Sequence, residues 1–376
     1  QWRFRPEWEL QLDGFYASDE RLLPALFRRL GENEQELTTR AYLRRIEGNT
    51  YLTLEGKGAT TDFIPNEHLA QSPGYFVDKL PEIDFGSIGT NPFDDALPFY
   101  LMHTWNASAS RMRLRFQEIT PSDVGLNNAG IANRIFGVNP SQPIADAARG
   151  VGLDEDFVTR VDTRQEFATK FDAGPITVNP FVVGRFTGYD TDFDAFNGGS
   201  GDEFRLWGAA GVTMSTSIFR IDDDLDSEIF DLHRMRHIIE PTVTLWHAGT
   251  TVDESELPVY DDDVESLLEG SSIRAGIHQT WQTKRGAPGR WRSVDVFTLD
   301  VEYVWYSDDT LERSPIGRYY SARPELSAAG EFIRAAGTWK VSEAVGIGAE
   351  TIWDVEDQRE DRNSLVMNVR HSLDLQ

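Results

Sequence analysis

The sequence predicts an all-β fold and, within that class, a partial antiparallel transmembrane β-barrel of about twelve to sixteen strands in meander order. Three observations favour this fold. Apolar and polar residues alternate with a period of two along most of the chain, as in strands with two different faces. Many of the alternating segments are near the roughly 9 to 11 residues that a tilted strand needs to cross a bilayer. Finally, some separators between them are short and others are long, which is the arrangement of membrane barrels.

The alternation is visible early in the chain and again near its middle. Leu52 and Leu54 alternate with Thr53 and Glu55. Further along, one face of a segment carries apolar residues, and the other carries the basic residues Arg111, Arg113 and Arg115. Charge within a strand suits a water-filled lumen, so we expect these three arginines to face the lumen.

The clearest alternation lies between Ser293 and Tyr306. Successive side chains of a strand point to opposite faces. We therefore expect one set of residues to face lipid and the acidic residues Asp300 and Glu302 to face the lumen. The lipid-facing set is Phe297, Leu299, Val301, Tyr303 and Trp305.

The separators between these segments are of two kinds. Residues 47–49 form a short turn, whereas residues 121–155, 190–203 and 249–272 form long, acidic separators rich in Gly and Pro. No linker or change of composition divides the chain, so we expect residues 1–376 to form one outer-membrane β-barrel domain. The first residues show no cationic start followed by an apolar core, so no signal peptide is predicted.

Composition excludes several functional classes. The chain has no cysteine, which removes disulfide scaffolds, thiolate metal sites and cysteine nucleophiles. Its formal charge of -26 argues against a nucleic-acid partner. No sequence motif of a catalyst, nucleotide-binding loop or cofactor site occurs, so we predict neither an enzyme nor a cofactor.

The histidine and acidic motifs match no known metal-site pattern. His233 and His237 stand four residues apart, but in a strand that spacing separates side chains by about 13 Å. The runs 222–224 and 261–263, each of three aspartates, are interpreted as solvated loop tips.

A soluble β-sandwich also alternates apolar with polar residues. Its strands are typically about five or six residues long, shorter than the segments here. The apolar faces also carry aromatics near their ends, including Trp305, Trp339 and Trp353, as the interfacial girdles of a barrel do. The membrane barrel is therefore favoured over the sandwich.

Pro241 interrupts one of the predicted strands. Proline cannot donate to a sheet ladder and is normally confined to a strand start, an edge or a bulge. We therefore expect a transmembrane strand to start at or just after Glu240. Residues 221–231 would then form a loop or an extramembrane extension of the strand.

Several segments together resemble a known family. They are RMRHIIEPTVTLWH (234–247), ELPVYDDDVESLLEGSSIRAGIHQTWQTKR (256–285), LPEIDF (80–85) and RVDTRQEFATKFDAGPITVNPFVVGRFTGYD (160–190). In their order along the chain they are similar to barrel strands of the LPS-assembly outer-membrane proteins, the LptD or organic solvent tolerance family. The resemblance is spread over most of the chain and rests on loose motifs.

The resemblance implies a function in the cell outer membrane. Family members insert lipopolysaccharide into the outer leaflet through a large barrel with a lateral opening between its first and last strands. The implied partners are lipopolysaccharide, a lipoprotein plug in the lumen, periplasmic bridge proteins and outer-membrane lipid. This chain shows no jellyroll domain, no aromatic terminus and none of the family's cysteines. The first two departures predict a barrel incomplete at both ends.

Two other functions remain open at this stage. A passive porin or another outer-membrane channel would also have a charged lumen, and a soluble carbohydrate-binding β-protein would need no membrane. The acidic loops are interpreted as cell-exterior or cation-binding, against the alternative of an acidic, salt-adapted lineage.

Overall fold

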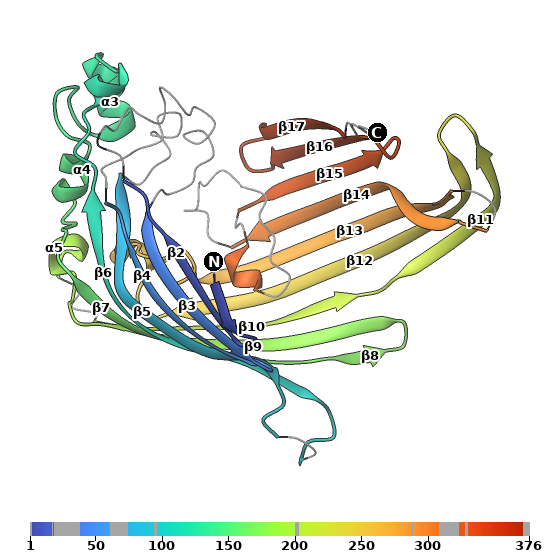
Figure 1. The fold of residues 1–376 in the computed structure, drawn as a ribbon, viewed down its shortest axis with the longest axis horizontal. Helices are drawn as coiled ribbons and strands as arrows, with labels where there is room; N and C mark the ends of the chain where they lie inside the picture. The colour runs from blue at the N-terminus through green and yellow to red at the C-terminus, as the bar shows by residue number, and fades with distance from the viewer. Residues whose placement is uncertain are drawn as a thin grey trace.

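The computed structural model describes residues 2–16, 18, 38–60, 74–93, 96–199, 203–286, 289–307, 323–327 and 330–370. These residues form one curved sheet of seventeen strands (Figure 1). In chain order the strands are β1 (Trp2–Arg5), β2 (Trp8–Asp13), β3 (Thr39–Glu47), β4 (Thr50–Gly58), β5 (Tyr75–Thr90), β6 (Leu101–Phe116), β7 (Val158–Thr169), β8 (Phe171–Ala173), β9 (Ile176–Tyr189), β10 (Phe204–Ser215), β11 (Ile218–Ser227), β12 (Leu232–Thr250), β13 (Gly270–Arg285), β14 (Arg292–Tyr306), β15 (Phe332–Lys340), β16 (Val345–Asp354) and β17 (Arg359–Val369).

Short helices lie in the connections between strands. The described α-helices are α3 (Ala129–Phe136), α4 (Ala145–Gly150) and α5 (Asp194–Asn197), and the 3₁₀ helices are η3 (Pro121–Val124), η4 (Glu254–Glu256) and η5 (Pro324–Leu326). Within the described ranges, no helix combines the length and the apolar character that a bilayer crossing needs.

The strands pair antiparallel in chain order, so the predicted all-β meander is confirmed. Two strands are interrupted. β7 and β8 are separated by Lys170, and both pair with β9. In the same way, β10 and β11 both pair with β12. The strand count falls within the predicted range when each interrupted pair is counted once. In the described part of the chain, no pairing joins β1 or β2 to β17, so the sheet is open.

The two ends of the strands differ in their connections. Long segments follow β6, β9, β12 and β14, and α3, α4 and α5 gather together at this end (Figure 1). At the opposite end, residues 48–49, 174–175 and 341–344 make short turns. We call these the long-loop end and the short-turn end.

The two faces of the sheet also differ. Residues paired directly across strands lie on the same face, so the register traces each face from β6 to β16. On one face, which we call the inner face, residues 251–269 cover β5, β7, β9 and β10, and we call these residues the inner loop. Apolar residues of the inner loop, α4 and the strands pack together there, namely Met112, Leu114, Phe116, Ala145, Val158, Tyr189, Val252, Leu257 and Tyr260.

Pro241 lies within β12 and not at its start, because β12 begins at Leu232. The sheet strand therefore starts before Glu240, and the start of its membrane-crossing part at or just after Glu240 remains a prediction. Pairing with β13 continues regularly through Pro241, which lies opposite Ile277. On the other side of β12, the boundary between β10 and β11 falls next to Pro241, and the Thr216 N–H donates to the Pro241 carbonyl over 3.2 Å.

The position of that boundary has a physical reason. In an antiparallel ladder, the N–H and C=O of one residue point to the same neighbouring strand. The carbonyl of Pro241 points to Thr216, so the N–H that proline lacks would also have pointed there. The missing donor therefore costs the ladder toward β10 and β11 one bond and costs the ladder toward β13 nothing.

Candidate functional site

The inner loop is attached to the inner face through one buried carboxylate, that of Glu265. Its side chain is fully enclosed. Glu265 Oε1 accepts hydrogen bonds from Arg160 Nη1 over 2.8 Å and from the Tyr189 hydroxyl over 2.9 Å. Its Oε2 accepts from the backbone N–H groups of Tyr260 and Asp261. One carboxylate thus joins β7, β9 and the loop's own backbone.

Other strand side chains donate to carbonyls of the inner loop. Arg205 of β10 donates to the carbonyls of residues 264, 265 and 267, and Arg185 of β9 donates to that of residue 263. Trp207 donates through Nε1 to the carbonyl of residue 268 over 2.9 Å, and the Tyr75 hydroxyl donates to that of residue 259 over 3.0 Å. The loop backbone is therefore bonded to the wall along much of its length.

Asp261 makes a second charged attachment. It pairs with Lys79 of β5 over 2.7 Å and with Arg160 over 2.6 Å. Burial disfavours the charged form of Asp261, but Arg160 and Lys79 outweigh burial and hold the pKa of this carboxyl below its usual value. The carboxylate is thus charged and paired at neutral pH. Interpreting residues 261–263 as a solvated tip was wrong for Asp261, whereas Asp262 and Asp263 are exposed.

Beyond the inner loop, the inner face carries alternating charges from strand to strand. Glu302 of β14 lies 2.8 Å from Arg274 of β13 and 3.5 Å from Arg334 of β15. Arg334 lies 2.6 Å from Glu350 of β16, which in turn lies 3.9 Å from Arg362 of β17. We call this row the charge ladder. Because opposite charges face each other across neighbouring strands, the ladder stabilises the sheet while keeping its inner face polar.

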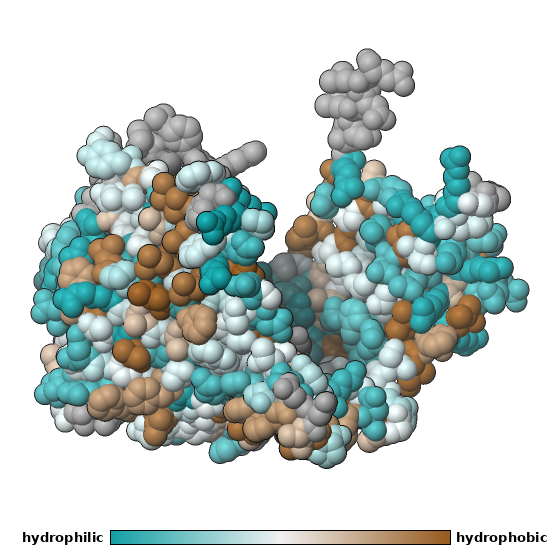
Figure 2. Space-filling view, turned by 60° about the horizontal axis from the view of Figure 1, so that its bottom comes forward, coloured by the Kyte–Doolittle hydropathy of each residue, from teal (hydrophilic) through white to brown (hydrophobic). Residues whose placement is uncertain are grey.

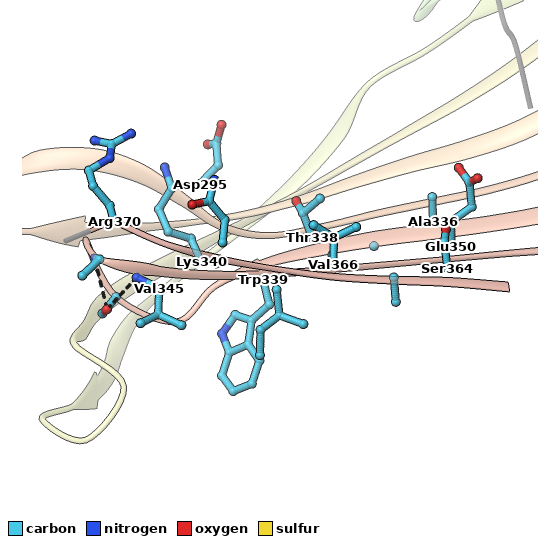
Figure 3. A pocket seen from close by; sticks show the side chains of 18 of the residues that line it. Asp295, Ala336, Thr338, Trp339, Lys340, Val345, Glu350, Ser364, Val366 and Arg370 are labelled. Carbon is cyan, nitrogen blue, oxygen red and sulfur yellow. Dashed lines mark hydrogen bonds between the residues drawn. The ribbon is translucent and has the colours of Figure 1, made fainter. Parts of the chain in front are cut away.

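A hollow of about 720 Å³ lies over the strands at the C-terminal side of the sheet. Figure 3 shows Asp295, Thr338, Glu350 and Arg370 on one side of the strands, and Trp339 pointing to the other. A second cavity, of about 550 Å³, is lined by Arg164 and Glu325, which form a salt bridge between β7 and η5. Both spaces have charged side chains in their walls and could take a polar ligand.

The outer face carries exposed apolar side chains. Val161, Val182, Leu206 and Val301 are examples, and patches of hydrophobic residues are visible on the side of the molecule in Figure 2. Apolar side chains on one face and ion pairs on the other are what a wall between lipid and water needs.

The predicted residues of β14 fall on opposite faces. Asp300 and Glu302 pair with His278 and Gly276 of β13, which places them on the inner face. The five apolar residues predicted to face lipid alternate with them and lie on the outer face. Their contact with lipid remains a prediction.

Arg111, Arg113 and Arg115 do not lie on the inner face. Met112 of β6 pairs with Val158 and packs against the inner-loop cluster, so the three arginines point the other way. Arg113 pairs with Asp78 over 3.0 Å, and Arg115 donates to the Ala59 carbonyl. The prediction that they face the lumen is not met. They lie near the long-loop end of β6, where outer-face charge finds partners on the protein itself.

Sequence reasoning missed Arg160, Glu265 and Asp261 as a group. Arg160 and Glu265 are 105 residues apart in the chain, and their pairing follows from the register of β7 and the path of the inner loop. Across the described ranges, no group of three or more histidine, aspartate or glutamate side chains is placed to hold a metal ion.

Comparison with known proteins identifies one matching family. The model of the family described as LptD, LPS transport system D, matches residues 1–372, nearly the whole chain. A search of curated proteins found no match.

Proposed function

Because the chain belongs to the LptD family of the LPS transport system, we propose that its sheet is the outer-membrane wall along which lipopolysaccharide reaches the outer leaflet. Membership supports a general part in lipopolysaccharide transport and assembly. The proposal adds that this sheet is the translocating barrel, with residues 1–376 acting as one outer-membrane domain. No catalytic residue is needed for this transfer.

The observation that carries the proposal is the difference between the two faces of the same strands. Moving a charged sugar head through hydrocarbon is costly, whereas a polar wall replaces the water around it. The charge ladder and the hollow beside it supply such a wall, and the outer face supplies an apolar surface for lipid. The head group would follow the inner face while the acyl chains stay in an apolar environment.

The proposed partners follow from the same arrangement. The inner loop covers β5, β7, β9 and β10, while the inner face from β14 to β17 stays open at the hollow. We place the lipoprotein plug against this open part. The periplasmic bridge proteins would meet the short-turn end, since short turns of outer-membrane barrels lie on the periplasmic side.

Site-specific photo-crosslinking in cells tests the proposal. Benzoylphenylalanine replaces Thr298 on the inner face or its neighbour Phe297 on the outer face, in the half of β14 nearer the short turns. We expect lipopolysaccharide adducts from position 298 that disappear when lipopolysaccharide synthesis is blocked. Position 297 should give phospholipid adducts.

A passive channel would give a different result. Neither position would then capture lipopolysaccharide, and the purified protein would conduct ions in planar bilayers. Lipopolysaccharide adducts from position 297 but not from 298 would place the lipid path outside the barrel and contradict the proposal.

A further inference from the structure

β11 has a free backbone edge. β9 pairs with β10 from Thr177 to Gly188 and begins at Ile176, opposite the end of β10. β11 continues past that point and, within the described residues, pairs only with β12. Among the described residues, the strand from Ile218 to Ser227 therefore has one side without a neighbouring strand, at the short-turn end of the sheet (Figure 1).

The register identifies which backbone groups are on the free side. The Thr216 N–H points to Pro241 of β12. Because alternate residues of an antiparallel strand bond to the same neighbour, residues 218, 220 and 222 point to β12. The N–H and C=O groups of Phe219 and Ile221 therefore point away from β12, toward the free edge. Pairing with β12 is regular from Ile218 to Asp222 and then shifts before Asp226, so the regular part of the edge is short.

The side chains along this edge are unusual for a surface strand. Ile218, Phe219 and Ile221 are each more than half exposed. They are followed by a strongly acidic hairpin, since residues 218–236 hold six carboxylates (Asp222, Asp223, Asp224, Asp226, Glu228 and Asp231) against three arginines (Arg220, Arg234 and Arg236). Exposed edges are normally blunted by charged side chains, Pro or a bulge. Within 218–222 there is no Pro and no bulge, and the charged side chains, Arg220 and Asp222, belong to the residues that bond to β12, not to Phe219 and Ile221 at the free edge.

We propose that β11 is a docking edge for an extended, lysine- or arginine-rich segment of another protein. The segment would add one strand beside Phe219 and Ile221, a recognition mode in which backbone bonds give affinity and side chains give selectivity. Positive charge on the segment would meet the acidic hairpin. A second copy of this chain is a poorer occupant, because edge-to-edge pairing would bring two acidic hairpins together. The inference rests on the edge of β11 and does not depend on lipid transport.

Hydrogen exchange on the unmodified full chain in detergent micelles tests the docking edge. The probe is a synthetic ten-residue peptide of alternating lysine and valine. Without peptide, the amides of Arg220 and Asp222 exchange slowly, because they bond to β12, and those of Phe219 and Ile221 exchange fast. We expect the peptide to slow exchange at Phe219 and Ile221. Unchanged exchange at both residues with saturating peptide would overturn the proposal.

Variants separate edge pairing from attraction by charge. Phe219→Pro with Ile221→Pro removes both outward N–H groups and no charge, and Phe219→Ala with Ile221→Ala keeps them. We expect the proline variant to bind the peptide about tenfold more weakly than the alanine variant, from the loss of two hydrogen bonds. Equal binding would mean that the peptide is held by charge alone and would overturn the proposal. If the proline variant does not fold, the hydrogen-exchange measurement on the unmodified chain still tests the proposal.

A second pair of controls addresses the nature of the partner. A peptide of alternating glutamate and valine should not protect Phe219 or Ile221, and Asp222→Asn with Asp224→Asn should weaken the lysine peptide. Equal protection by both peptides would contradict a basic partner. Concentration-dependent protection of the same amides without any peptide would show that a second copy occupies the edge, and would also contradict it.

Discussion

Arg160 of β7 donates to Glu265 of the inner loop over 2.8 Å, and the two side chains are 2% and 0% exposed. A buried ion pair adds little by itself, because both charges have been taken out of water. Removing one partner is different, since the remaining charge then stays buried with fewer partners. Glu265 also satisfies Tyr189 and two backbone donors of its own loop, so its loss would leave several buried donors without their acceptor.

Replacing Glu265 with Ala should lower the free energy of unfolding by about 3–5 kcal/mol, because the Tyr189 hydroxyl and two backbone N–H groups lose their acceptor and buried Arg160 keeps only Asp261 as a close partner. Denaturant titration of the purified protein in micelles measures it. Asp262→Ala, which removes an exposed carboxylate of the same loop, is the matched control and should change little. Equal effects of the two substitutions would contradict the assignment of Glu265 as the attachment point.

The attachment of the inner loop should weaken in acid. The pKa of Asp261 is lowered in the folded protein, so its contribution is fully present above the usual aspartate pKa and is lost as pH falls through the lower, folded value. Stability should therefore fall below about pH 4 in the wild type. Asp261→Asn should be less stable at pH 7 and should lose less between pH 5 and pH 3. Parallel pH profiles for the two proteins would argue against this role.

Glu302 lies between two arginines of the charge ladder. Glu302→Ala should lower the free energy of unfolding by about 1–3 kcal/mol, because Arg274 loses a charged hydrogen-bond partner and Arg334 loses one of its ion-pair partners. Asp300→Ala on the same strand should cost less, since the Asp300–His278 pair is more exposed. A double-mutant cycle with Arg274→Ala measures the coupling energy between Arg274 and Glu302. A coupling energy near zero would contradict a stabilising role for the charge ladder.

Single cysteines can test the two faces of β14, because the natural chain has no cysteine. Asp300→Cys should react with a small water-soluble maleimide, since the inner face is polar. Leu299→Cys should resist that reagent in membranes and react with a membrane-permeant one. Reaction of both positions with the water-soluble reagent would contradict the lipid-facing prediction for residues 297, 299, 301, 303 and 305.

Pro241→Ala supplies an N–H where the Thr216 carbonyl lacks a donor from β12. We expect β10 and β11 to join into one strand, so that amide exchange at Thr216 and Ile218, whose N–H groups point to β12, becomes slower. Lipopolysaccharide export should be unchanged, because the proline is accommodated by the strand boundary beside it. A loss of export with normal folding would instead indicate that the boundary takes part in lipid movement.

The alternation in the sequence was sufficient to predict the sheet and the two faces of β14, because a strand's geometry fixes which residues share a face. The alternation was not sufficient for Arg111, Arg113 and Arg115. Their charge predicted the inner face, but they lie on the outer face, where protein groups are available as partners. The alternation also missed the inner loop, because Glu265 meets residues of strands far back in the chain. Pro241 is accommodated by the boundary between β10 and β11, which lies beside it in the sheet. The sequence around the proline does not reveal this boundary.

The inner loop also implies an order of assembly. Hairpins between sequential strands can form one after another as the chain is laid down, since each needs only its neighbour. The inner loop instead needs Tyr75, Arg160, Arg185 and Arg205 in place at once, and these come from four strands that precede it. Its docking is therefore a late event, which can occur only on a wall already paired in the correct register. A wall paired in the wrong register would leave the inner loop undocked. Protection of the loop's backbone amides from hydrogen exchange would therefore report on correct assembly.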